Sequence, residues 1–189
     1  MSQRTFWMRW RVRVGYPVGA LYWVLARPMR HAILYGAIVA AFGLLVRGIA
    51  AGHLRKDKAL ATTGPYASTR NPLYLGSAIL AAGFVVAAHS WIAGALVGIY
   101  FGVFYYAVMR NEEQDLRVRF GAAFDEYAAR VALFFPRVPD PAVAAAAGAG
   151  AGFSWAQYLR NREYRALIGT VAGFGIVWLR MWIRAKYGY

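Results

Sequence analysis

The chain has 189 residues, a formal net charge of +14 and no cysteine, and 60% of its residues are hydrophobic. A mean hydropathy of +0.37 and long apolar runs are too apolar for an ordinary soluble domain and indicate an integral membrane protein. The missing cysteine excludes disulfides, a thiolate zinc site and a cysteine nucleophile.

Apolar stretches recur along the chain at lengths close to the roughly 20 residues that a helix needs to cross the bilayer. The predicted spans are residues 14–26, 33–51, 73–90, 91–109 and 166–183. The first is shorter than the others and contains a Gly15-Tyr16-Pro17 break, so it is either a tilted span or an interfacial segment. The pattern therefore predicts an all-α membrane protein with about five transmembrane helices.

The third and fourth predicted spans are separated by little beyond His89-Ser90, which predicts a helical hairpin. Small residues on both spans would let their backbones approach closely. After the fourth span, apolar residues in 111–131 recur at spacings of three and four, which is typical of an amphipathic helix or a helix-turn-helix pair. We expect 111–137 to be a cytosolic region and 138–152, rich in proline, alanine and glycine, to be a linker.

Most basic residues flank the apolar runs instead of forming one continuous patch. This distribution is typical of charges that set membrane topology and contact anionic lipid, and it argues against nucleic acid as a partner. The link between the third and fourth spans carries no charge beyond a possible His89. We therefore expect that tip to face outward, and the amino terminus and the long basic loops to face the cytoplasm, in a prokaryotic inner membrane.

The most polar segment at a membrane boundary is Gly64–Gly76, which holds a turn, a cation, an amide and two phenols. Unpaired polar groups in hydrocarbon cost several kcal/mol each, so this segment needs a polar partner. Arg70, Asn71 and Tyr74 lie within about one helical turn and can face one pocket. Glu112-Glu113 and Arg130 lie across the predicted hairpin from this segment, so the two parts would form walls of one pocket.

These two segments together resemble the signature of the integral membrane methyltransferases, which include isoprenylcysteine carboxyl methyltransferase and the phosphatidylethanolamine N-methyltransferases. The resemblance covers about residues 48–137. Asn71 stands where those proteins usually carry histidine, so a titrating imidazole is not expected there. The residues that carry the resemblance are Gly64-Pro65-Tyr66, Arg70-Asn71-Pro72, Tyr74 and Gly76, and then Glu112-Glu113, Leu116, Phe120-Gly121, Phe124, Tyr127, Arg130-Val131 and Pro136.

The resemblance implies one methyltransferase domain over residues 1–189 and S-adenosylmethionine as cofactor. Binding that cofactor calls for an anion near its amine, a cation or amide near its carboxylate, and a flat apolar slot for its adenine. The expected cofactor-binding residues are Tyr66, Arg70, Asn71, Tyr74, Glu112, Glu113 and Arg130, and the expected catalytic residues are Glu113 and Arg130. Arg130 has an alternative partner in Glu126 at i, i+4, and the two glutamates can also serve a helix start.

On the substrate side we expect His53, Tyr105 and Tyr106, whose alternatives are ordinary interfacial positions. Three scattered histidines give no ligand cluster, so no metal site is expected. The predicted function is methyl transfer to a membrane-embedded lipid or isoprenoid acceptor, a prenylcysteine-like carboxylate being preferred. The alternatives are a phospholipid amine N-methyltransferase, a membrane NADPH-dependent reductase of the sterol type, and a non-catalytic lipid-binding protein.

Overall fold

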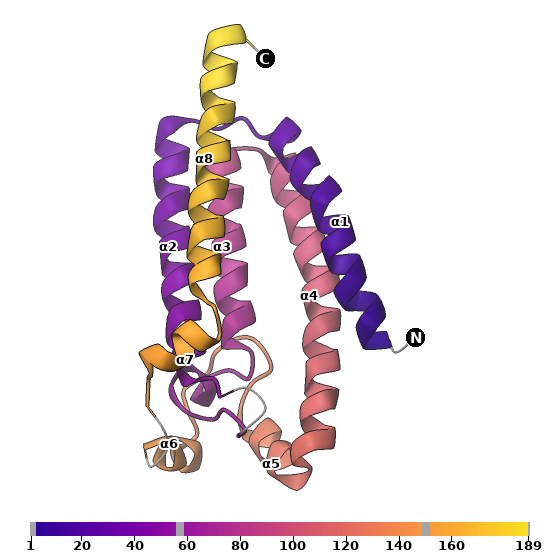
Figure 1. Cartoon of the computed structure of the whole chain (residues 1–189), viewed down its shortest axis with the longest axis vertical. Coiled ribbons are helices and arrows are strands. Elements are labelled where there is room, and N and C mark those ends of the chain that lie inside the picture. Colours follow the sequence, from indigo (N-terminus) through magenta and orange to yellow (C-terminus); the bar gives the residue numbers. More distant parts are fainter. Residues whose placement is uncertain (1–2, 56–58, 149–151, 189) are drawn as a thin grey trace.

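The computed structural model describes residues 3–55, 59–148 and 152–188, which fold into long helices running alongside one another (Figure 1). The short helices and their loops gather at one end of the bundle, called the loop end below. The long helices are α1 (Gln3–Leu25), α2 (Arg30–His53), α3 (Pro72–Ala88), α4 (Trp91–Phe120) and α8 (Tyr164–Tyr187). The short ones are η1 (Gly64–Ala67), α5 (Ala122–Arg130), α6 (Pro141–Gly148) and α7 (Trp155–Arg160).

The long helices stand where the five spans were predicted, and the prediction of an all-α membrane protein is confirmed. Within the described residues, α2, α4 and α8 are long and apolar enough to cross a membrane, and α3 is a shorter apolar helix. Helix α1 begins at Gln3, well before residue 14, and continues through Pro17 without ending there. The break predicted at Gly15-Tyr16-Pro17 is therefore absent.

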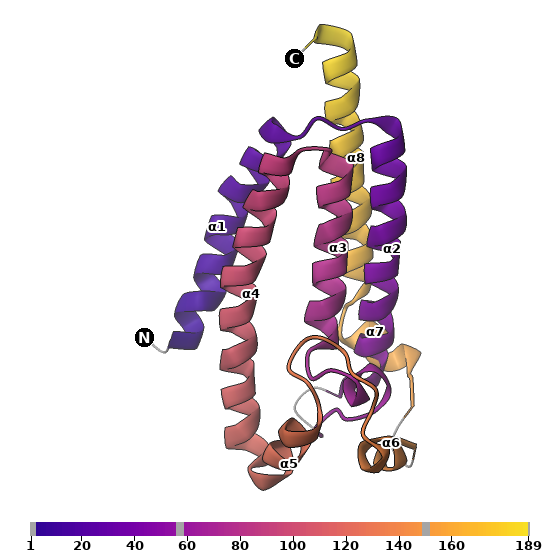
Figure 2. The same ribbon diagram turned by 180° about the vertical axis from the view of Figure 1, so that it is seen from behind.

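Helices α1 and α4 form one side of the bundle, and α2, α3 and α8 form the other, as both faces of the molecule show (Figures 1 and 2). The α3–α4 hairpin is present and turns through His89, which adopts a left-handed conformation with φ of 48°. The closest backbone approach on the glycine face of α3, however, is to α2. A Cβ added at Gly43 would lie 2.7 Å from the carbonyl oxygen of Gly76, and one at Gly83 would lie 2.5 Å from that of Gly36.

Helix α4 extends beyond residue 109 to Phe120, so it carries the first part of the region that we expected to be cytosolic. Gly121 then breaks the helix with a φ of +52°, and α5 follows, which is the helix-turn-helix alternative of the sequence pattern. Buried Phe124 and Tyr127 on α5 pack with Ala67 of η1. This small apolar cluster holds α5 against the start of the polar segment. The predicted linker contains helix α6, and residues 149–151 lie outside the described part.

Candidate functional site

The polar segment that opens α3 is paired with the stretch of chain that follows α5. The backbone N–H of Arg70 donates to the carbonyl of Ala132 at 2.8 Å, and the Thr69 hydroxyl donates to that of Phe134 at 2.9 Å. The amide nitrogen of Asn71 donates to the carbonyl of Leu133 at 2.9 Å. Asn71 is buried, so its side chain is engaged in holding these two chain segments together. The backbone of 132–134 is thus one polar partner that the segment required.

The side chain of Arg70 lies in a buried charge cluster with α4 and α5. Its Nη2 is 2.8 Å from Oε1 of Glu113, and its Nη1 donates to the carbonyl of Ala128 at 2.7 Å. The other carboxylate oxygen of Glu113 accepts from Nη1 of Arg110 at 3.0 Å. Oε1 of Glu113 and Nε of Arg70 are buried without a hydrogen bond in the described residues, because the close Arg70–Glu113 contact lacks hydrogen-bond geometry.

Tyr74, in the first turn of α3, joins this cluster to the second glutamate, Glu112. Its hydroxyl donates to Oε1 of Glu112 at 2.7 Å, and its ring meets the edge of Tyr105 with centroids 5.6 Å apart. Glu112 is exposed whereas Glu113 is buried, although the two are adjacent in the sequence. This difference follows from the helix geometry of α4, which turns neighbouring residues about 100° apart.

A cavity of about 420 Å³ at the loop end brings together six of the seven predicted cofactor-binding residues. They are Tyr66, Arg70, Asn71, Tyr74, Glu112 and Glu113. The rest of its lining includes apolar side chains, among them Leu60, Phe120 and Phe124, and the charged side chains of Asp115 and Arg119. We call this cavity the polar pocket. It combines both signs of charge with an apolar surface, which is the chemistry that S-adenosylmethionine requires, so the residues present fit that cofactor.

Two buried tyrosines, Tyr66 and Tyr127, line the polar pocket, and their phenol groups are neutral. The Tyr127 hydroxyl donates to the backbone carbonyl of Tyr66 at 2.7 Å. Burial raises the pKa of both phenols well above the ordinary value of 10.0. Tyr66 contributes its ring to the wall and Tyr127 fixes the backbone beneath it. Neither phenol ionises at neutral pH.

Two of the predicted residues lie elsewhere. The side chain of Arg130 is half-exposed, with Nη1 3.9 Å from a carboxylate oxygen of Asp140, and it is not among the residues that line the polar pocket. His53 ends α2, where its Nδ1 lies 2.8 Å from the carbonyl of Ile49 and its ring packs on Phe153. Neither position brings the side chain to the polar pocket.

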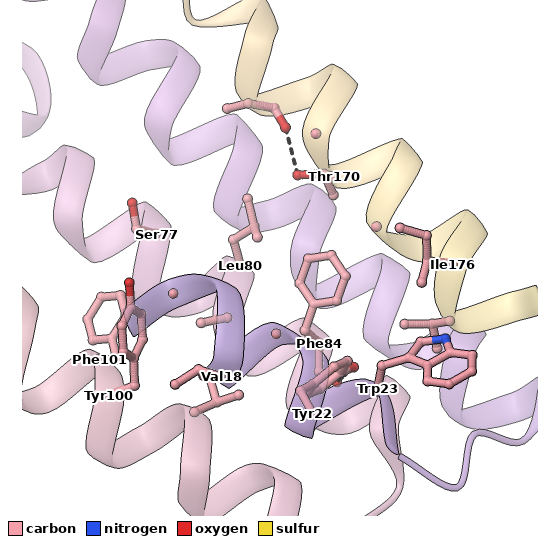
Figure 3. Close-up of a pocket in the computed structure, with 18 of the residues that line it drawn as sticks. Val18, Tyr22, Trp23, Ser77, Leu80, Phe84, Tyr100, Phe101, Thr170 and Ile176 are labelled. Carbon is pink, nitrogen blue, oxygen red and sulfur yellow. Dashed lines mark hydrogen bonds between the residues drawn. The ribbon is translucent and has the colours of Figure 1, made fainter. Parts of the chain in front are cut away.

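Tyr105 and Tyr106 lie on α4 beside two further cavities. The larger, of about 540 Å³, lies among α1, α3, α4 and α8, and its walls are almost entirely apolar; we call it the membrane cavity (Figure 3). Tyr105 lines it, and also lines a groove of about 520 Å³ between α4 and residues 132–137, where Tyr106 joins it. Because Tyr105 touches Tyr74, a wall of the membrane cavity is in contact with a wall of the polar pocket.

Sequence reasoning missed the polar end of the membrane cavity, which is formed by Arg47 and Ser77. Arg47 pairs with Glu163, with Nε 2.5 Å from one carboxylate oxygen and Nη2 3.0 Å from the other, and it also donates to Ser77 and to the carbonyl of Leu73. Arg47 was visible as an interruption of its apolar run. Its partner, 116 residues away in the chain, carried no signal.

The fold and these cavities define the class: an all-helical membrane protein with a charged pocket at one end of the bundle and an apolar cavity among its helices. Residues 43–123 match the model of the phospholipid methyltransferase family, which confirms the resemblance carried by the two motifs. The similarity to the integral membrane methyltransferases therefore rests on this segment of the chain.

Two relatives match a stretch of the chain similar in length to the family match. The chain is 38% identical over 84 residues to the nickel-cobalt-cadmium resistance protein NccN of Alcaligenes xylosoxydans xylosoxydans, covering 44% of this chain and 39% of that protein. It is 37% identical over 84 residues to the cobalt-zinc-cadmium resistance protein CzcN of Cupriavidus metallidurans, covering 44% and 38%. The match thus spans about two-fifths of either relative. No solved structure matches the chain.

Proposed function

We propose that the protein transfers a methyl group from S-adenosylmethionine to a lipid acceptor held in the membrane. The observation that carries this proposal is the contact between Tyr74, which lines the polar pocket, and Tyr105, which lines the membrane cavity. A charged cofactor and an apolar acceptor can each bind in a chemically suitable place and still meet at one aromatic wall. The family match over residues 43–123 supports the same reaction class.

The residues of the polar pocket have distinct proposed roles toward the cofactor. Glu112, exposed toward the cavity, would accept hydrogen bonds from the α-amino group, and Arg70 would face the carboxylate. Glu113 holds Arg70 in place through the buried ion pair, and the ring faces of Tyr66 and Tyr74 flank the apolar side. When bound, S-adenosylmethionine would supply a methyl group activated by a sulfonium cation, toward which an aromatic face is favourable.

Catalysis would then rest on positioning and on exclusion of water, because a methyl transfer to an existing nucleophile needs no proton removal. An amine acceptor would need a base, for which Glu113 and His53 are the candidates. Glu113 lies between Arg70 and Arg110, and His53 lines neither the polar pocket nor the membrane cavity. A carboxylate acceptor, as in a prenylcysteine, is already nucleophilic. This arrangement favours the carboxylate over the phospholipid amine.

Binding of small ligands to the purified protein tests the reaction class. We expect S-adenosylmethionine and S-adenosylhomocysteine to bind in calorimetric titrations and NADPH not to bind. Binding of NADPH alone would favour the reductase alternative, and binding of none of the three would favour a non-catalytic lipid-binding protein. Either result would refute the proposal.

The acceptor class can be tested separately. Membranes that contain the protein are incubated with methyl-labelled S-adenosylmethionine, and the labelled lipids are treated with alkali. A methyl ester releases labelled methanol under these conditions, whereas an N-methyl group stays on the lipid. Release of the label supports a carboxylate acceptor, and retention would show that an amine is methylated.

A further inference from the structure

The membrane cavity is built from two sources. Its α3 and α4 walls, together with Arg47, fall within residues 43–123, which match the family model. Its remaining walls come from α1 and α8, which lie outside that segment (Figure 3). Of the residues that line the polar pocket, only Phe124 and Tyr127 lie beyond residue 123. The polar pocket is thus formed almost entirely by the segment that matches the family model, whereas about half of the membrane cavity lining lies outside that segment.

Helix α8 is fixed in place as a wall of the membrane cavity. At its first turn, buried Glu163 forms the two-pronged ion pair with Arg47 of α2. Farther along, the ring of Phe174 lies against that of Phe84 on α3, with centroids 4.6 Å apart. Gly173 sits on the same ring, since a Cβ there would come within 2.7 Å of Phe84. A charge pair and an aromatic contact therefore hold α8 at separate points along its length.

Between these contacts the wall is open because its residues are small. Gly169 lines the membrane cavity, and a Cβ added there would meet no atom within 4 Å. Gly19 on α1 lines the same cavity and also has open space beside it. A Cβ at either position would therefore meet no atom of a neighbouring helix.

We propose that α8, together with α1, forms the wall that determines which acceptor is bound, and that Gly169 keeps room for one hydrocarbon chain of a membrane lipid. Three observations point to this occupant. Two of the helices around the cavity, α4 and α8, are long and apolar enough to span the bilayer. The cavity walls are almost entirely apolar, and the volume falls in the range of about 300–1,000 Å³ of small-molecule sites. Arg47, Ser77 and Tyr105 line one end of the membrane cavity, and Tyr105 contacts Tyr74 of the polar pocket. A lipid headgroup would sit at this end of the membrane cavity. The identity of that lipid as a methyl acceptor rests on the proposed function.

The test is to fill the space at Gly169 and to measure the lipid that the protein retains. Gly169→Leu and Gly169→Ala add four carbons and one carbon at a residue that lines the cavity. The matched control is Gly175→Leu on the same helix, because a Cβ at Gly175 also meets no atom within 4 Å but this residue does not line the cavity. Each protein, purified in detergent, is offered an equimolar mixture of short-chain and long-chain lipids with one headgroup. Native mass spectrometry then measures how much of each is bound.

We expect Gly169→Leu to lower bound long-chain lipid about tenfold, which corresponds to roughly two methylenes excluded from an apolar site. Gly169→Ala should have a smaller effect in the same direction, and Gly175→Leu should bind lipid as the unchanged protein does. Equal lipid binding by Gly169→Leu and the unchanged protein would overturn the proposal, as would equal losses in Gly169→Leu and Gly175→Leu.

Titration with S-adenosylhomocysteine separates this proposal from the proposed function. All three variants should bind it with unchanged affinity, because neither Gly169 nor Gly175 lines the polar pocket. If the unchanged protein bound lipid in the membrane cavity but no cofactor, the methyltransferase proposal would fail and the role of α8 would stand. If cofactor binding were intact and lipid binding were insensitive to Gly169, the role of α8 would fail alone.

Discussion

The adjacent glutamates Glu112 and Glu113 should respond differently to the same conservative change. Glu113 is buried, with its carboxylate oxygens 2.8 Å from Arg70 and 3.0 Å from Arg110. Glu112 is exposed toward the polar pocket and accepts a hydrogen bond from Tyr74. Glutamine retains the shape of either side chain and removes its charge. We expect Glu113→Gln to impair both stability and cofactor binding, and Glu112→Gln to impair binding alone.

The magnitudes follow from burial. In Glu113→Gln the guanidinium of Arg70, only 13% exposed, loses the opposing charge. Removing one member of a buried pair costs about 3–5 kcal/mol, and glutamine retains an acceptor oxygen, so we expect about 3 kcal/mol. For a chain of this size that corresponds to a fall in Tm of roughly 6–12 °C. Glu112→Gln keeps an acceptor for Tyr74 and should change stability by less than about 0.5 kcal/mol.

The binding effect of Glu112→Gln follows from its proposed contact with the cofactor amine. A hydrogen bond to a charged group contributes about 1.5–3 kcal/mol, so the Kd for S-adenosylhomocysteine should rise roughly 10- to 100-fold. Thermal unfolding in detergent and calorimetric titration measure the two quantities. Arg117→Ala is the control, because Arg117 pairs with half-exposed Asp125 on the surface and does not line the polar pocket. A normal Tm for Glu113→Gln, or normal binding by Glu112→Gln, would refute this reasoning.

Other predictions test the aromatic wall, the helix packing and the buried phenols. Tyr74→Phe removes one hydroxyl at the polar pocket and should weaken S-adenosylhomocysteine binding about 3- to 10-fold by calorimetry without lowering Tm. Gly83→Ala, whose Cβ would lie 2.5 Å from the Gly36 carbonyl, should cost about 1–3 kcal/mol in thermal unfolding, whereas Gly98→Ala, in open space, should not. Because burial raises the pKa of Tyr127 above 10.0, the unfolded chain loses its phenol protons first. The stability that neutral Tyr127 contributes is complete below pH 10 and is lost as the pH rises further. The Tm of the unchanged protein should therefore fall above pH 10, and the Tm of Tyr127→Phe should fall less steeply.

The polar pocket could be predicted in large part because many of its residues lie on α3 and α4, two antiparallel helices joined by a short turn at the other end of the bundle. Tyr74 begins α3 and Glu112 follows the membrane part of α4, so antiparallel helices return them to the same end of the bundle. Arg130 shows the limit of such reasoning. It is the last residue of α5, and the chain direction after Gly121 decides which side it faces. The spacing of apolar residues in 111–131 does not indicate the direction that the chain takes after Gly121.

Close packing of α3 illustrates a second limit. We predicted that its small residues would pack closely against α4, and this partner was wrong, because a glycine face has no chemical preference for one helix over another. Their partner is α2, through Gly36 and Gly43. The sequence neighbour α4 is joined by a short turn but does not approach these glycines. Contacts between residues far apart in the chain, such as Arg47 with Glu163, require the folded arrangement for their identification.

Asn71 and Gly76 show that part of the Gly64–Gly76 segment stabilises the fold. Both lie in a motif that resembles a cofactor-binding signature, yet the amide of Asn71 binds the backbone of Leu133 and a Cβ at Gly76 would lie 2.5 Å from Cγ of Arg47. Gly76 thereby lets Arg47 lie against α3 and reach Glu163, the first anchor of α8. Part of the motif therefore has a supporting role: it joins the polar pocket to the 132–134 backbone and lets α2 carry the ion pair that positions the outer wall of the membrane cavity. Changes at these two residues should consequently affect stability and acceptor binding, and not only cofactor affinity.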